Sequence, residues 1–149
     1  MRESAQHARI HHVLRHSAGQ AGRHLSGHAF AQIRERDGRY HERGYLFVLA
    51  ALEFAQGRLP ARRHLSGGEL AWACRDFALE QFGLLAPAVL DYWGITSTDD
   101  LGRVVFMLID VGLLARQESD RVEDFEGVYD FAEVFREGYR WPGVEGSRA

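Results

Sequence analysis

Residues that cross-link chains or bind metals are scarce in this sequence. Cys74 is the one cysteine among 149 residues, which excludes an internal disulfide and a CxxC zinc motif. The apolar runs are short, and the run at residues 104–109 is far below the length that crosses a bilayer. No charged start followed by an apolar leader opens the chain. We therefore expect a cytoplasmic protein and predict neither a metal site nor a cofactor.

Lysine is absent, and the remaining charges divide unevenly along the chain. Residues 1–75 hold 12 Arg and 6 acidic residues, a net +6, whereas residues 76–149 hold 6 Arg and 15 acidic residues, a net −9. A chain with a basic first half and an acidic second half is suited to contacts between oppositely charged surfaces.

The length fits one domain, and the composition divides the chain into three parts. Residues 1–28 are predicted to be a flexible His-rich arm, because they contain few large apolar residues. Residues 29–138 are predicted to form a single helical domain, and residues 139–149 a C-terminal tail.

Histidine pairs with i,i+4 spacing occur in the arm, and such pairs on one side of a helix bind Zn²⁺ or Ni²⁺ readily. A structural metal site also needs further ligands held by a packed surrounding shell, and the arm has no core to provide one. No metal site is therefore predicted at His7, His11, His12 and His16.

Apolar residues at helical spacing predict a mainly α fold, a compact bundle of five to six short helices. Ser66 with Glu69, and Ser97 with Asp100, have the spacing of helix N-caps. The helix at residues 99–111 has the most regular stripe, and we expect its apolar face to be buried as one group. That face comprises Leu101, Val104, Val105, Leu108 and Ile109. The other expected helices lie within residues 29–38, 40–57, 66–83, 86–93 and 131–137.

Residues 113–125 allow two interpretations. Residues 113–116 and 121–125 could pair as a small two-stranded arm, which would make the domain winged-helix-like. Neither run alternates well between apolar and polar residues, so an acidic loop is the other interpretation.

Acidic residues in and after this segment are candidates for binding a basic protein partner. Their spacing does not match the calcium-binding EF-hand loop. An aromatic residue beyond the last helix is a further candidate contact. The predicted partner-binding residues are Asp120, Glu123, Asp124, Glu126 and Trp141.

Nucleic-acid binding through an Arg-rich loop is the first alternative function. Arg58, Arg62 and Arg63 form a compact basic group, and phosphate contacts require such cations. The helix at residues 99–111, which a winged helix would place on DNA, begins with two aspartates and is followed by more acids. Because this acidic face would repel DNA, we rank nucleic-acid binding below protein binding.

An enzyme of unrecognised type is the second alternative, and no residue is predicted to be catalytic. A reactive thiolate at Cys74 would need a histidine base, and neither His41 nor His64 has an orienting carboxylate close by in the sequence. We expect Cys74 to be a buried, inert thiol.

Four ordered segments carry a resemblance to a known family: DGRYHERGYLFVLAALEFA, RHLSGGELAWACRDFALEQFGLLAPAVLDYWGI, STDDLGRVVFMLIDVGLL and EDFEGVYDFAEVF. Residues 33–135 thus resemble a conserved hypothetical family of short bacterial proteins, of planctomycete and verrucomicrobial type. The resemblance implies one compact domain and no particular activity or cofactor. The leading functional expectation is a non-enzymatic protein-interaction module of unknown partner.

Overall fold

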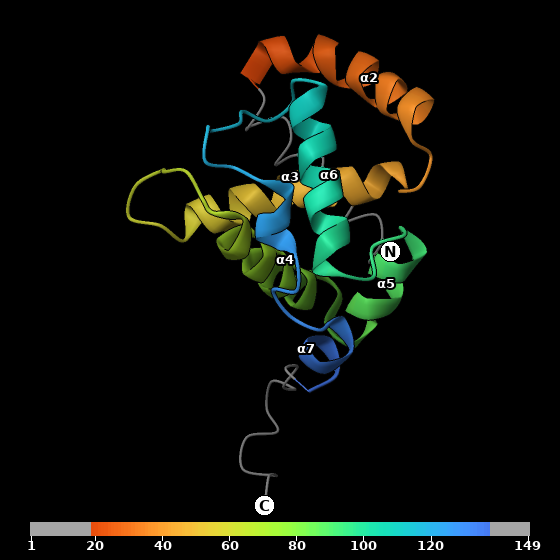
Figure 1. The fold of residues 1–149 in the computed structure, drawn as a ribbon, viewed down its shortest axis with the longest axis vertical. Helices are drawn as coiled ribbons and strands as arrows, with labels where there is room; N and C mark the ends of the chain where they lie inside the picture. Colours follow the sequence, from red (N-terminus) through yellow and green to blue (C-terminus); the bar gives the residue numbers. More distant parts are fainter. Residues whose placement is uncertain (1–18, 138–149) are drawn as a thin grey trace, which may run out of the picture.

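The computed structural model describes residues 19–137, which form a helical bundle without strands in that range (Figure 1). Its α-helices and short 3-10 helices follow one another with brief connections. They are α2 (Gly19–Arg36), α3 (Glu42–Gly57), α4 (Gly67–Phe82), η1 (Gly83–Leu85), α5 (Ala86–Tyr92), α6 (Thr98–Asp110), η2 (Val122–Phe125) and α7 (Phe131–Glu137). None of the helices described is both long enough and apolar enough to cross a membrane.

Helix α3 forms the centre of the bundle, and α4 and α6 both pack on it. In Figure 1, α6 crosses in front of α3. Every residue from 44 to 51 is buried, more than the one-sided stripe that the sequence indicated. The ring of Phe47 lies 5.5 Å from that of Phe77 and 5.7 Å from that of Trp93. A helix surrounded on all sides is apolar all round, so its periodicity understates its burial.

The predicted helix starts are confirmed. The Ser66 hydroxyl accepts a hydrogen bond from the Glu69 N–H, and the Glu69 carboxylate accepts one from the Ser66 N–H, which completes a capping box. The Ser97 hydroxyl accepts from the Asp100 N–H in the same way at α6. Helix α2, by contrast, begins at Gly19 rather than near Ala29. The helix continues on its N-terminal side past the amphipathic segment that the sequence pattern indicates.

A buried carboxylate fastens the start of α6 to the α2–α3 connection. The hydroxyl of Tyr40 donates to Asp100 at 2.5 Å, and the Thr96 N–H donates to the same carboxylate at 2.9 Å. Burial alone would raise the pKa of Asp100, but the hydrogen bonds from Tyr40, Thr96 and Ser97 hold that pKa below its usual value. Asp100 therefore stays ionised and joins three parts of the chain.

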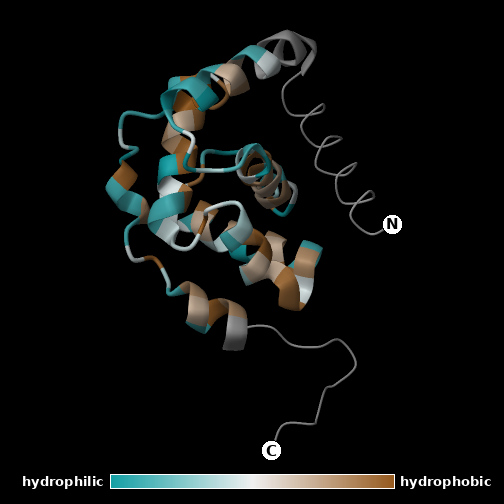
Figure 2. Ribbon diagram, turned by 90° about the vertical axis from the view of Figure 1, so that its right-hand side faces the viewer, coloured by the Kyte–Doolittle hydropathy of each residue, from teal (hydrophilic) through white to brown (hydrophobic). Residues whose placement is uncertain are grey.

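Of the two interpretations of residues 113–125, the two-stranded arm is wrong, and with it the winged-helix-like form of the domain. Residues 113–121 are an irregular loop, and the next four residues form η2 instead of a second strand. Figure 2 shows that the loop before η2 is largely hydrophilic. Beyond Ala115 the run has no apolar side chain that a strand could bury. One residue at its end, Phe125, is only 3% exposed and anchors the segment in the core.

Two glycines make room for Phe125. A Cβ atom added at Gly102 on α6 would lie 2.8 Å from the Cβ of Phe125. A Cβ at Gly67 on α4 would lie 3.0 Å from its ring. Because real contacts are longer than this, a side chain at either position would push Phe125 outward. The paired glycines thus bring η2 against α4 and α6.

The predicted apolar stripe of α6 is buried at four of its five positions, and Ile109 is partly exposed. Changing Val105, which is 7% exposed, to Asp should destabilise the fold by about 3 kcal/mol or more, because the charge has no partner in the core. Val122, which is 39% exposed, provides a matched control. Thermal melting should show a large loss for Val105→Asp and a small one for Val122→Asp; equal losses would contradict the core assignment.

The second prediction concerns the space beside Phe125. Gly102→Ala should destabilise by about 1–3 kcal/mol through overpacking, although alanine itself favours helix. Gly68 has no atom within 4 Å of an added Cβ, so Gly68→Ala should be neutral or stabilising by up to about 1 kcal/mol. Chemical denaturation of both variants measures the difference, and a stabilised Gly102→Ala protein would refute the close fit.

Candidate binding pocket

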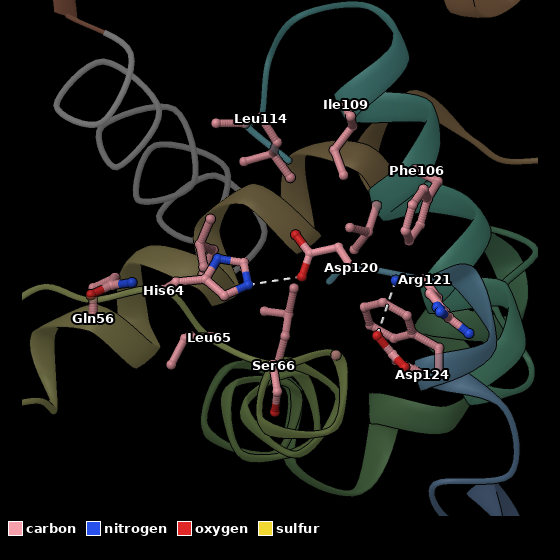
Figure 3. A pocket seen from close by; sticks show the side chains of 16 residues that line it. Gln56, His64, Leu65, Ser66, Phe106, Ile109, Leu114, Asp120, Arg121 and Asp124 are labelled. Carbon is pink, nitrogen blue, oxygen red and sulfur yellow. Dashed lines mark hydrogen bonds and ion pairs between the residues drawn. The ribbon is translucent and has the colours of Figure 1, made fainter. Parts of the chain in front are cut away.

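A pocket of about 210 Å³ opens between α3, α4, α6 and the loop before η2 (Figure 3). The three helices and the loop all contribute apolar side chains to its lining. These include Leu52, Leu70, Val105, Ile109, Leu114 and Phe125. The partial exposure of Ile109 is explained by its position here, facing the pocket rather than the closed core.

The α3–α4 connection places polar groups at the mouth of the pocket. The side-chain amide of Gln56 accepts a hydrogen bond from the Arg63 N–H at 3.1 Å and donates to the Arg63 carbonyl oxygen. This pairing turns the connection back against the end of α3. His64 and Ser66 then follow directly, and both line the pocket.

His64 and Asp120 join the two loops that border the pocket. The His64 Nε2 lies 2.8 Å from the Asp120 carboxylate, a contact drawn as a dashed line in Figure 3. The other oxygen of Asp120 accepts from the Gln117 N–H at 2.8 Å, and the Arg116 guanidinium donates to the Asp120 carbonyl. The Asp120 side chain is only 17% exposed. It therefore shapes its own loop and attaches that loop to the α3–α4 connection.

This pair corrects the sequence analysis, which found no carboxylate positioned to orient His64. The two residues are 56 positions apart, so only the fold brings them together. Asp120 lies in a polar run that has the composition of a turn, and this local pattern gives no sign of a contact with His64.

The predicted partner-binding acids separate into two groups. Asp120 and Asp124 line the mouth of the pocket, whereas Glu123 and Glu126 are exposed on and just after η2. Residues 116–126 contain five acids and two arginines, so the segment is strongly acidic. Trp141, the remaining predicted contact, lies outside the described residues, as do His7, His11, His12 and His16.

Each arginine of the predicted nucleic-acid site faces an acid. Arg58 lies 2.9 Å from Asp76. Arg62 makes two hydrogen bonds to Glu53, and Arg63 makes two to Glu69. The hydrogen bonds from Arg63 and from the Ser66 N–H hold the pKa of Glu69 at about 2, so this acid stays charged. The ion pairs neutralise much of the positive charge that a phosphate would meet.

Covalent chemistry has little support among these residues. Burial raises the pKa of Cys74 to about 12, so its thiol stays protonated, as expected for an inert buried cysteine. The Ser66 hydroxyl, which lines the pocket, serves as the N-cap of α4. Within the described part of the chain, no group of three or more His, Cys, Asp or Glu side chains is arranged to hold a metal.

No protein-family model, curated protein or solved structure matches the chain. The resemblance to a conserved hypothetical bacterial family therefore stays a prediction, and the pocket has to be interpreted from its own chemistry.

The ion pairs predict weak nucleic-acid binding. Mixed DNA and RNA should bind only weakly near physiological salt, and changing Arg58, Arg62 and Arg63 together to Ala should alter that binding little. The triple change should lower the melting temperature slightly, because three surface ion pairs are lost. Filter binding or fluorescence anisotropy over a salt series measures the affinity. Tight, salt-sensitive binding that the triple change abolishes would restore the nucleic-acid alternative.

Proposed function

We propose that this chain is a non-enzymatic protein-interaction module that binds a basic segment of a partner protein. The partner places one large apolar side chain in the pocket and sets flanking Arg or Lys residues against the acidic loop. The observation that carries this proposal is the combination of an apolar lining with a mouth at which two acids, Asp120 and Asp124, outnumber one arginine, Arg121. We further propose that the module acts in the cytoplasm.

The size of the pocket suits a single side chain. An apolar cavity of about 150 Å³ is large enough to take up benzene, so about 210 Å³ accommodates one aromatic or large aliphatic group. Apolar and aromatic anchors buried in such pockets contribute much of the affinity of protein interfaces. The walls come from three packed helices, which reduces the entropy lost when the anchor binds.

The charge around the pocket favours a basic partner. Among the described residues, Glu118, Glu123, Asp124 and Glu126 take part in no ion pair. Their uncompensated charge would attract cations and speed the encounter with a basic segment. The same charge would repel a polyanion, and the nearest cluster of arginines is already paired with acids. These contrasts support a protein partner over nucleic acid.

A matched pair of substitutions tests the pocket. Leu114→Arg places a cation in the pocket, whereas Leu85→Arg places one on the exposed η1 surface, where the side chain is 67% exposed. The probe is a panel of labelled peptides that each carry one Trp, Phe or Leu between arginines. We expect Leu114→Arg to weaken the best peptide by about tenfold or more, as for loss of an anchor contact, and Leu85→Arg to have little effect.

The acidic contribution is tested separately through salt and charge. Glu123→Gln combined with Asp124→Asn should lower the affinity and flatten its dependence on salt, whereas Glu80→Gln, an exposed acid outside the pocket, should not. The proposal fails if no peptide binds, or if the Leu114 and Leu85 variants bind equally well. Circular dichroism confirms that each variant is folded.

A further inference from the structure

The chain itself contains a segment with the chemistry that the pocket requires. Residues 138–149, GYRWPGVEGSRA, follow α7 and lie outside the described residues. Trp141 is a large apolar group, and Arg140 is its immediate neighbour. We propose that the pocket of one molecule binds the Trp141 segment of a second copy of this chain. This inference rests on the proposed function, because it assigns a partner to the same pocket.

Size and charge complementarity support Trp141 as the anchor. A tryptophan ring offers a large apolar surface with one polar N–H, and the pocket combines an apolar lining with carboxylates at its mouth. A guanidinium at the neighbouring position would meet the acids of the loop before η2 and of η2 itself. The segment contains two arginines and one acid, so its charge is opposite to that of the loop.

The proline after Trp141 lowers the cost of binding. In a peptide of this sequence, Pro142 has a fixed φ and disfavours helical backbone at the residue before it. Fewer conformations are then lost when the segment enters the pocket.

The geometry favours a second copy over the same molecule. The pocket lies at the start of α4, whereas α7 packs on both α4 and α5, and α5 follows the end of α4 (Figure 1). A 16-residue helix such as α4 is about 24 Å long. Trp141 is four residues beyond the end of α7 at Glu137, a span of at most about 14 Å. Four residues leave little chain with which to turn back along α4 towards the start of that helix, which favours the pocket of a second copy.

Exchange between two copies satisfies both pockets at once. Each molecule would supply one tail and one pocket, so a pair related by twofold symmetry closes without leaving a free site. A partner protein that uses the same pocket would then have to displace the tail. Self-association and partner binding would compete.

A complementation experiment tests this assignment in the full chain. Sedimentation velocity over about 1 µM to 1 mM should show the wild-type mass rising towards that of a dimer. Trp141→Ala removes the anchor and Leu114→Arg blocks the pocket, so each variant alone should stay monomeric. A mixture of the two retains one intact tail and one intact pocket, and should form a one-to-one pair. Tyr92→Ala, at an aromatic side chain that is 77% exposed on α5, should dimerise like the wild type.

A synthetic peptide of residues 138–149 distinguishes failure of the self-recognition proposal from failure of the proposed function. We expect it to bind the Trp141→Ala protein and to bind about tenfold or more weakly when Leu114→Arg is added. If other Arg-flanked apolar peptides bind the pocket and this one does not, the self-recognition proposal fails and the proposed function stands. If no peptide binds, both fail. A wild-type protein that stays monomeric throughout, or variants that dimerise normally, would also overturn the second-copy assignment.

Discussion

The close fit of Phe125 between α4 and α6 determines what this surface can do. Gly67 and Gly102 leave just enough room for its ring, and any larger residue there would displace it. With Phe125 in place, η2 is held against both helices, and the preceding loop lines the pocket together with the end of α3. That loop encloses the space between the helices on one side. The pocket therefore exists because two glycines face one phenylalanine.

Polar contacts add to the packing of Phe125 in shaping the pocket. Asp120 accepts hydrogen bonds from its own loop and pairs with His64 on the α3–α4 connection. These contacts occupy its carboxylate with protein groups and reduce its exposure. Asp124 and the glutamates around it have no such cationic partner among the described residues, so they carry the charge that an incoming segment would meet. Asp124 also has a structural contact, since its carboxylate accepts a hydrogen bond from the Arg121 N–H at the start of η2.

Local sequence patterns predicted where the helices begin better than they predicted which residues are in contact. The capping residues Ser66 and Ser97 fixed two helix starts, because a cap depends on residues only three positions apart. The strands expected within residues 113–125 did not form, since a side chain from the end of that segment is buried by partners 23 and 58 positions earlier, Gly102 and Gly67. The local sequence does not indicate these contacts. For the same reason the His64–Asp120 pair was missed, although both residues had been considered separately.

Under the proposed function, the distribution of ion pairs accounts for a preference for a basic partner in a chain of modest net charge. The arginines of the α3–α4 connection face acids from α3 and α4, so the positive charge of that connection is paired within the protein. The acids of residues 116–126 exceed the arginines there, and most have no partner in the described part of the chain. A ligand that approaches the pocket therefore meets the acidic excess rather than the average charge. Since surface ion pairs contribute little to stability, this arrangement matters more for recognition than for folding.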